Sequence, residues 1–202
     1  MTASRLCLPQ AIDDEYLTGA GEPPGEQPPG TIAIIGCYIE AVRLQDIIGQ
    51  FLAPINHHLE SGRASSWCVK GDLNLKTVLE IDRLLDDWRF NLPVHLRIET
   101  YQSGQGAELG QRQQRLMLLE RQANVLTARF LHARLTLLRP GLSVLCAADA
   151  EHGPRTGSMD REMVIKAANM CLSATEALVD LLSSNMDPQA DRLPAPWYNV
   201  FY

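Results

Sequence analysis

A long stretch without glycine or proline, residues 111–139, constrains the fold of this chain more than any other feature. Apolar residues recur there at alternating spacings of three and four, which places them in one row along an α-helix: Leu116, Leu119, Ala123, Leu126, Phe130, Ala133 and Leu137. A second apolar set lies about 100–140° around the same helix: Met117, Ala128, Leu131, Leu135 and Leu138. Because a helix that is apolar on two sides needs two neighbours, we predict a central, buried helix over about residues 111–139.

Two apolar rows before this stretch predict two more helices. The first row follows Thr31, a plausible N-cap, and Pro54 is expected to end or kink the helix; it consists of Cys37, Ala41, Leu44, Ile48, Phe51 and Ile55. The second row follows a possible cap at Asp72 and is stopped by Leu92-Pro93; it consists of Val78, Ile81, Leu85, Trp88 and Leu92. Residues 100–110, rich in Gly and Gln, are expected to be a mobile connection.

After the central stretch, Arg139-Pro140 predicts a kink or an end of the helix, with a short helical piece over 142–149. Ser158 is then placed to cap a last helix, whose row is Val164, Ala168, Cys171, Thr175, Leu178 and Leu182. No segment shows the strict alternation of a strand, and no Asn-Gly or Asp-Gly hairpin signal occurs. The sequence therefore predicts an all-α fold, an irregular array of helices around the central one.

The chain divides by composition at about residue 30. Residues 1–30 combine an acidic stretch with a Pro/Gly-rich one and are expected to form an extended lead-in. Residues 31–202 are expected to form one helical domain, since 202 residues suit a single core. The chain closes on PWYNVFY, residues 196–202, which has the pattern of a helix that has just begun. We therefore expect the chain to be truncated at its C-terminus, a fragment of a larger helical domain.

Composition excludes several classes of function. The formal charge of −6 gives no basic patch for nucleic acid, and the arginines of the central stretch scatter around the helix at about 100° per residue. The five cysteines are far apart and form no CxxC pair, which indicates reduced thiols, mostly in the core, of an intracellular protein. No secretory h-region or apolar run of membrane-spanning length is present, so membrane insertion is disfavoured.

Few residues suggest chemistry. The five histidines lack metal-ligand spacing, so no metal site is predicted. Asp82 and Asp86 share one helical face and could serve as paired carboxylates in acid–base catalysis. Ion pairs of Asp86 with Arg89 and of Arg83 with Asp87 favour instead a solvated charged face.

One residue breaks the local pattern, because Arg134 projects only about 40° from the row of Phe130. Its stem could be buried while its guanidinium reaches solvent. Alternatively, Arg134 forms a buried ion pair with a carboxylate between Glu80 and Asp87 or with Glu176.

Two stretches carry a resemblance to a known family: LDDWRFNLPVHL at 85–96 and RQANVLTARFLHARLTLLRP at 121–140. They resemble the regulatory domain, or middle homology region, of fungal transcription factors that carry an N-terminal binuclear zinc cluster. RLCLPQAIDDEYL at 5–17 is similar to the acidic lead-in of that family, and LPAPWYNVFY at 193–202 is similar to the start of a later helix. The expected family-signature residues, all structural, are Asp87, Trp88, Arg89, Pro93, Arg129, Arg134, Arg139 and Pro140.

The resemblance implies a non-enzymatic role in transcription regulation, in the nucleus. Expected partners are other domains of the same or a related factor, a co-regulator or a small-molecule effector. The family binds DNA through six closely spaced cysteines that ligate zinc, and this sequence lacks them. We therefore expect no cofactor and no direct nucleic acid contact in this segment. Two alternatives remain: a helical enzyme with an interhelical pocket using Asp82, Asp86 or His132, and a helical adaptor or dimerisation module.

Overall fold

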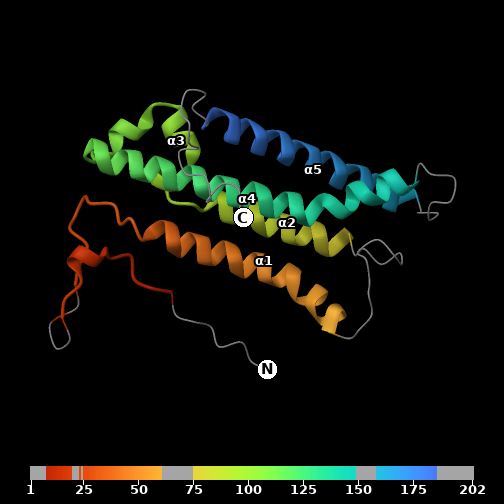
Figure 1. Ribbon diagram of the computed structural model, residues 1–202, viewed down its shortest axis with the longest axis horizontal. Coiled ribbons are helices and arrows are strands. Elements are labelled where there is room, and N and C mark those ends of the chain that lie inside the picture. The colour runs from red at the N-terminus through yellow and green to blue at the C-terminus, as the bar shows by residue number, and fades with distance from the viewer. Residues whose placement is uncertain (1–7, 20–22, 24, 61–74, 149–157, 186–202) are drawn as a thin grey trace, which may run out of the picture. The chain divides into compact units, whose positions relative to one another are not determined.

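The computed structural model describes residues 8–19, 23, 25–60, 75–148 and 158–185, and every regular element in these ranges is helical (Figure 1). Four helices are long: α1 (Gly36–Glu60), α2 (Leu75–Phe90), α4 (Gln113–Ala148) and α5 (Ser158–Ser184). Shorter elements are α3 (Ile98–Gln102) and the 3-10 turns η1 (Asp14–Tyr16), η2 (Val94–Leu96) and η3 (Gln105–Leu109). The predicted all-α fold is confirmed.

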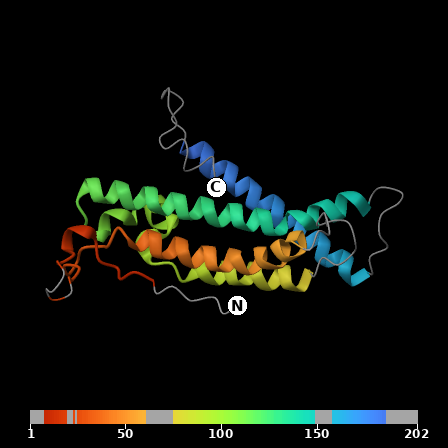
Figure 2. The same cartoon turned by 60° about the horizontal axis from the view of Figure 1, so that its bottom comes forward.

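The chain forms two compact units that share two helices. The first unit comprises Met1–Arg43 and Leu92–Leu126, and the second comprises Leu44–Asn91 and Thr127–Tyr202. Helices α1 and α4 each contribute their N-terminal part to the first unit and their C-terminal part to the second, and Figure 2 shows both as long continuous helices. The predicted division of the sequence at residues 30 and 31 stays a prediction.

Helix α4 buries the row of residues that predicted it. Leu119, Ala123 and Leu126 are buried in the first unit, and Phe130, Ala133 and Leu137 are buried in the second; Leu116 is half-buried. In the second apolar set Leu131 and Leu138 are buried, but Met117 is 62% exposed, so its predicted burial is wrong. The second neighbour is α5, which contacts α4 at Leu135 and Gly141, well C-terminal of Met117.

The sequence predicted a kink or an end of the helix at Pro140, and the end is wrong, because α4 continues through Pro140 to Ala148. Proline removes one backbone hydrogen bond and crowds the preceding turn, so close packing must offset the loss. Pro140 and Gly141 are both buried, and a Cβ added to Gly141 would lie 2.9 Å from the Cβ of Ala167 in α5. The missing side chain at 141 lets the two helices approach closely. The short helix predicted over 142–149 is the last part of α4.

Helix α1 begins and ends later than the sequence suggested. It starts at Gly36 rather than after Thr31, and it passes Pro54 to reach Glu60, so neither the predicted cap nor a helix end at Pro54 is correct. Pro54 has no N–H to donate to the carbonyl of Gln50. Gln50 is exposed, so water can donate to this carbonyl instead. At the other end, a side chain distant in sequence takes the place of the local cap, as described below.

Helices α2 and α5 follow their predicted rows with small differences. All five residues of the α2 row are buried, and α2 ends at Phe90, just before Leu92-Pro93; Asp72 lies outside the described residues. In α5 the first half of the predicted row is buried. Ala167, Ala174 and Leu181 are buried as well, so the centre of the packed face lies about 40° around the helix from the predicted row. No described helix has the length and apolar content needed to cross a bilayer.

Residues 98–109 form α3 and η3 where an irregular connection was expected. The hydroxyl of Tyr101 donates to the His95 carbonyl at 2.7 Å, and the buried Gly106 lies beneath the Tyr101 ring. Gly104 and Gly110 adopt positive φ angles of 76° and 64°, which other residues adopt only with strain. The glycines that suggested mobility therefore serve as turn residues that flank η3.

Candidate functional site

Buried charge is concentrated in two arginine–carboxylate clusters, one in each unit. Three carboxylates are buried among the described residues: Asp13, Glu40 and Asp82. Glu40 is paired within α1 with Arg43 at 2.6 Å. Asp13 and Asp82 instead pair with arginines of α4, Arg115 and Arg134, that lie far away in sequence. These two clusters are the candidate functional sites.

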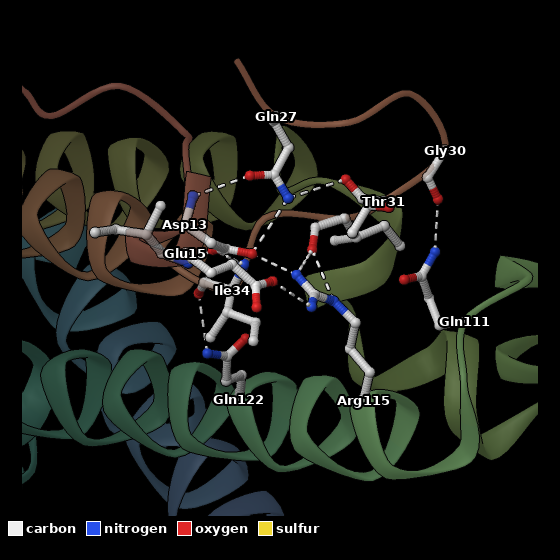
Figure 3. A network of polar contacts seen from close by, with 11 residues as sticks. Asp13, Glu15, Gln27, Gly30, Thr31, Ile34, Gln111, Arg115 and Gln122 are labelled. Atoms are coloured by element: carbon white, nitrogen blue, oxygen red, sulfur yellow. Dashed lines mark hydrogen bonds and ion pairs between the residues drawn. The ribbon is translucent and has the colours of Figure 1, made fainter. Parts of the chain in front are cut away.

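The first cluster fixes the N-terminal segment to α4 (Figure 3). Nη2 of Arg115 donates to a carboxylate oxygen of Asp13 and, at 2.7 Å, to the carbonyl of Ile32. Glu15 lies 3.6 Å from Nη1 of the same arginine. The side chains of Arg115 and Asp13 are 18% and 9% exposed, so this ion pair forms away from bulk water, where it is stronger than on the surface, whereas Glu15 is exposed.

Asp13 also binds the backbone at the entry to α1. Its Oδ1 accepts from the N–H groups of Ile34 and Ile35 at 2.6 and 3.2 Å, just before the helix begins at Gly36. Unpaired N–H groups and the helix dipole both favour an anion at this position. Asp13 therefore acts as an N-terminal cap supplied from 21 residues away.

Glutamine side chains complete the first cluster. Gln27 accepts from the N–H of Asp13 at 2.9 Å and donates to its carboxylate at 3.2 Å. Gln122 and Gln111 donate to the carbonyls of Ile34 and Gly30, respectively, at 3.0 and 2.8 Å (Figure 3). Sequence reasoning missed this cluster, since the acidic lead-in was interpreted as an extended segment. No local pattern marked Asp13 as different from Asp14.

The second cluster lies around Arg134 in the second unit. Its Nε is 2.7 Å from Oδ1 of Asp82 in an ionic contact, and its Nη2 donates to Oδ2 of Asp82 at 2.9 Å and to Asp86 at 3.2 Å. The side chains of Arg134 and Asp82 are only 19% and 6% exposed. The hypothesis that Arg134 forms a buried ion pair with α2 is confirmed, and the alternative of a guanidinium in open solvent is wrong.

Aromatic rings complete the second cluster. Trp88 and Phe130 stack with their centroids 6.2 Å apart and their planes 23° from parallel. The guanidinium carbons of Arg89 and Arg134 lie 5.3 and 5.8 Å from the Phe130 centroid, within the range of cation–π attraction. Phe130 therefore contributes both to the core and to the placement of the arginine that binds α2.

The electrostatics of this cluster do not favour acid–base catalysis. Burial raises the pKa of Asp82, and the Arg134 guanidinium offsets part of that rise. Arg134 engages both candidate carboxylates, Asp82 and Asp86, while His132 is exposed. The predicted solvated face is correct for Arg83 and Asp87, which pair at 3.9 Å on the surface. The predicted solvated face is wrong for Asp82, because its carboxylate binds Arg134 of α4 and is buried between α2 and α4.

The structure places the eight family-signature residues in different surroundings. Trp88, Arg89 and Arg134 belong to the second cluster, and Pro140 is buried within α4. Asp87 and Arg139 are exposed, Arg129 is half-buried, and Pro93 precedes η2. Their role as a family signature stays a prediction.

Cysteines and metal ligands give no further candidate. Among the described residues no three His, Cys, Asp or Glu side chains are grouped so as to hold a metal ion. Cys37, Cys146 and Cys171 are free thiols, of which only Cys171 is buried, so the predicted core location holds for that one. Burial raises the pKa of the Cys171 thiol, which keeps it protonated and unreactive.

Comparison with known proteins connects the chain to a transcription factor. The chain is 26% identical over 132 residues to sorbicillinoid biosynthetic cluster transcription factor 2 of Penicillium rubens. The match covers 61% of this chain but only 17% of that protein. No family model and no solved structure matches the chain. The chain therefore contains a region related to part of a transcription factor.

Proposed function

We propose that this chain acts in transcription regulation as a non-enzymatic regulatory domain, or part of one, of a fungal zinc cluster transcription factor. The observation that carries the proposal is the 132-residue similarity to a fungal transcription factor. The matched stretch is about a sixth of that protein, so the proposal concerns a module and not the activity of a whole factor. The similarity of the 85–96 and 121–140 stretches to the middle homology region supports the same assignment.

The geometry supports a structural role for the charged residues. In each cluster a buried carboxylate is bound by an arginine of α4, and those contacts connect segments far apart in the sequence. An acid–base catalyst needs a carboxylate free to exchange a proton with substrate, whereas Arg134 binds both Asp82 and Asp86. The proposed domain acts through surfaces that these clusters hold in place, toward other domains of the same factor, a co-regulator or a small-molecule effector in the nucleus.

A reporter assay tests the proposal. The chain is fused to a DNA-binding domain of known target, and reporter output is compared with that of the DNA-binding domain alone at equal protein level. We expect the fusion to raise or lower output at least about threefold, well beyond the scatter of equal-level controls. Arg134→Ala should abolish the change, because it removes the ion pair that fixes α2 to α4.

Arg83→Ala is the matched control, since it removes an arginine of which 82% is exposed. An output that does not change with the wild-type fusion, while the chain accumulates in the nucleus, would contradict the proposal. Equal loss of output for both arginine variants would show that the effect does not depend on the second cluster.

A further inference from the structure

The described residues that precede α1 are attached to their unit mainly through polar contacts. They are residues 8–19, 23 and 25–35, called the strap below, and Asp13 is the only buried one among them. The isoleucines of the strap are at most half-buried, and Leu17 is 60% exposed. Because burial of apolar surface is the dominant stabilising contribution in folding, the strap is held less firmly than the helices beside it.

Three side-chain donors, on α4 and just before it, bind main-chain carbonyls of the strap (Figure 3). The donor–acceptor pairs, with their distances, are Gln111 to Gly30 (2.8 Å), Arg115 to Ile32 (2.7 Å) and Gln122 to Ile34 (3.0 Å). These acceptors are alternate residues, whereas the intervening carbonyl of Thr31 accepts from Gln27 of the strap itself at 3.3 Å. Such alternation is that of an extended chain. The donors therefore hold this part of the strap by its backbone.

Asp13 connects these contacts to the start of α1. Its carboxylate binds the Arg115 guanidinium and the N–H groups of Ile34 and Ile35. Gln27 accepts from the N–H of Asp13 and donates to its carboxylate. Most contacts of the strap thus share a residue with another contact, so the loss of one weakens the others. A network of this kind can open cooperatively, at a lower free energy than the core.

We propose that the strap opens and closes as one piece while the helices of its unit stay folded, and that Arg115 holds it closed. Opening separates the guanidinium from Asp13 and exposes a cation and several N–H donors that the closed strap binds. Salt screens separated charges and so favours the open state. The strap is therefore a conformational device that responds to ionic strength. The proposal concerns the purified chain and does not rest on its role in transcription.

Amide hydrogen exchange of the full chain, followed residue by residue by NMR, tests the proposal. The reporters are the N–H groups of Asp13, Ile34 and Ile35, each of which is bound within the network of the strap. Their protection factors should agree within about threefold, because one opening reaction exposes all three. They should be at least about tenfold below those of Leu119 and Ala123, buried α4 residues of the same unit.

Two variants separate cooperative opening from the loss of isolated contacts. Gln111→Ala removes a hydrogen bond to Gly30, four residues before the nearest reporter in α1's entry. It should nevertheless lower protection at all three reporters by one common factor of about threefold, the contribution of one hydrogen bond. Arg115→Gln should lower it at least about tenfold while the two α4 amides stay protected. Arg112→Gln is the matched control, since it removes the same charge from an exposed position, and it should change nothing.

Salt dependence tests whether Arg115 holds the strap closed. Raising sodium chloride from about 0.1 to about 1 M shortens the screening length from about 10 to about 3 Å. Protection at the three reporters, corrected for the intrinsic exchange rate in the same buffer, should then fall at least about twofold in the wild type. The same change of salt should have less effect on Arg115→Gln, which lacks the ion pair with Asp13.

Three results would overturn the proposal. Reporters that exchange as slowly as the buried α4 amides would mean that the strap opens only when its unit unfolds. A Gln111→Ala variant that leaves the N–H of Asp13 unchanged would mean that the contacts open one by one. Equal salt dependence in the wild type and in Arg115→Gln would mean that the ion pair does not hold the strap closed.

Discussion

A single guanidinium, that of Arg134, binds two carboxylates of α2, and one of them is almost fully buried. Removing one partner of a buried pair leaves the other charge without compensation. Arg134→Ala should therefore lower the free energy of unfolding by about 2–4 kcal/mol. This loss lies near the lower end of the range for breaking a buried ion pair, because Asp86 is half exposed. Urea denaturation followed by circular dichroism measures the loss.

Two variants separate the ion pair from general effects of losing an arginine. Arg83→Ala removes a surface partner of Asp87 and should change stability by less than about 0.5 kcal/mol. Asp82→Asn added to Arg134→Ala should recover part of the loss, because a neutral amide is less costly to bury than a carboxylate. A double variant as unstable as the sum of both single changes would contradict the assignment of the loss to an uncompensated Asp82.

His95 gives the first unit a dependence on pH. Burial lowers the pKa of this imidazole below its usual 6.5, so the folded state prefers the neutral form. The unfolded chain therefore takes up a proton at a higher pH than the folded one. Its contribution to stability should be present above about pH 6.5 and should be lost as the pH falls through the lower folded-state pKa.

The measurement for His95 is the urea midpoint of wild type and of His95→Gln at several pH values. The difference between the two proteins should change as the pH falls below about 6.5, the wild type losing relative stability toward the acid end of the range. A difference that is constant over this range would show that His95 keeps its ordinary pKa in the folded chain.

At the scale of the helix, the structure differs from sequence-based expectation at the ends of elements more than in their interiors. The rows of apolar residues correctly located α2, α4 and α5, because burial of one face follows directly from periodicity. Helix ends depend on partners that the local sequence does not show. The cap of α1 comes from Asp13, and Pro140 is tolerated within α4 because Gly141 allows close packing with α5.

The capping role of Asp13 can be tested by comparing its replacement with that of the neighbouring residue Asp14. Asp13→Ala removes an acceptor from the N–H groups of Ile34 and Ile35 and an anion from Arg115. We expect a loss of about 2–3 kcal/mol, the cost of leaving buried polar groups unsatisfied. Amide hydrogen exchange should also become faster at Ile34 and Ile35. Asp14→Ala, at an exposed position, is the control and should alter neither quantity.

The close approach of α4 and α5 at Gly141 predicts opposite effects for two glycine substitutions. Gly141→Ala should destabilise the chain by about 1–2 kcal/mol, because overpacking outweighs the gain in helix propensity. Gly49→Ala in α1 should stabilise it by about 0.5–1 kcal/mol, since the added methyl meets open space. Thermal unfolding of both variants gives the signs, and a stabilising Gly141→Ala would show that α5 can move away without cost.

At the scale of the whole molecule, two units share α1 and α4, and each contains its own buried arginine–carboxylate cluster. The second cluster could be located in part from the sequence, because Arg134 stands out inside an apolar row. The first could not, since Asp13 and Arg115 are separated by 102 residues and each lies in an ordinary polar context. Long-range partnership of this kind leaves no periodic signal.

The charge of the whole chain predicts how it behaves toward nucleic acid. Non-specific binding to DNA requires a surface that replaces counterions on several phosphates. The net charge is −6, and two arginines of α4, Arg115 and Arg134, are already bound to carboxylates. Of the exposed arginines nearby, Arg112 precedes α4, and Arg121 and Arg139 lie 18 residues apart in it, about 27 Å along the helix, so they form no continuous basic stripe.

The isolated chain should therefore show no retention of duplex DNA at physiological salt, and lowering the salt should add little affinity. Fluorescence anisotropy of a labelled duplex, titrated with the chain at several salt concentrations, measures both. A binding constant that falls steeply with salt, with a slope of about −4 or beyond, would require at least about four phosphate contacts. That result would require a basic surface that the described arginines of α4 do not form, and it would contradict the expectation that this segment makes no direct nucleic acid contact.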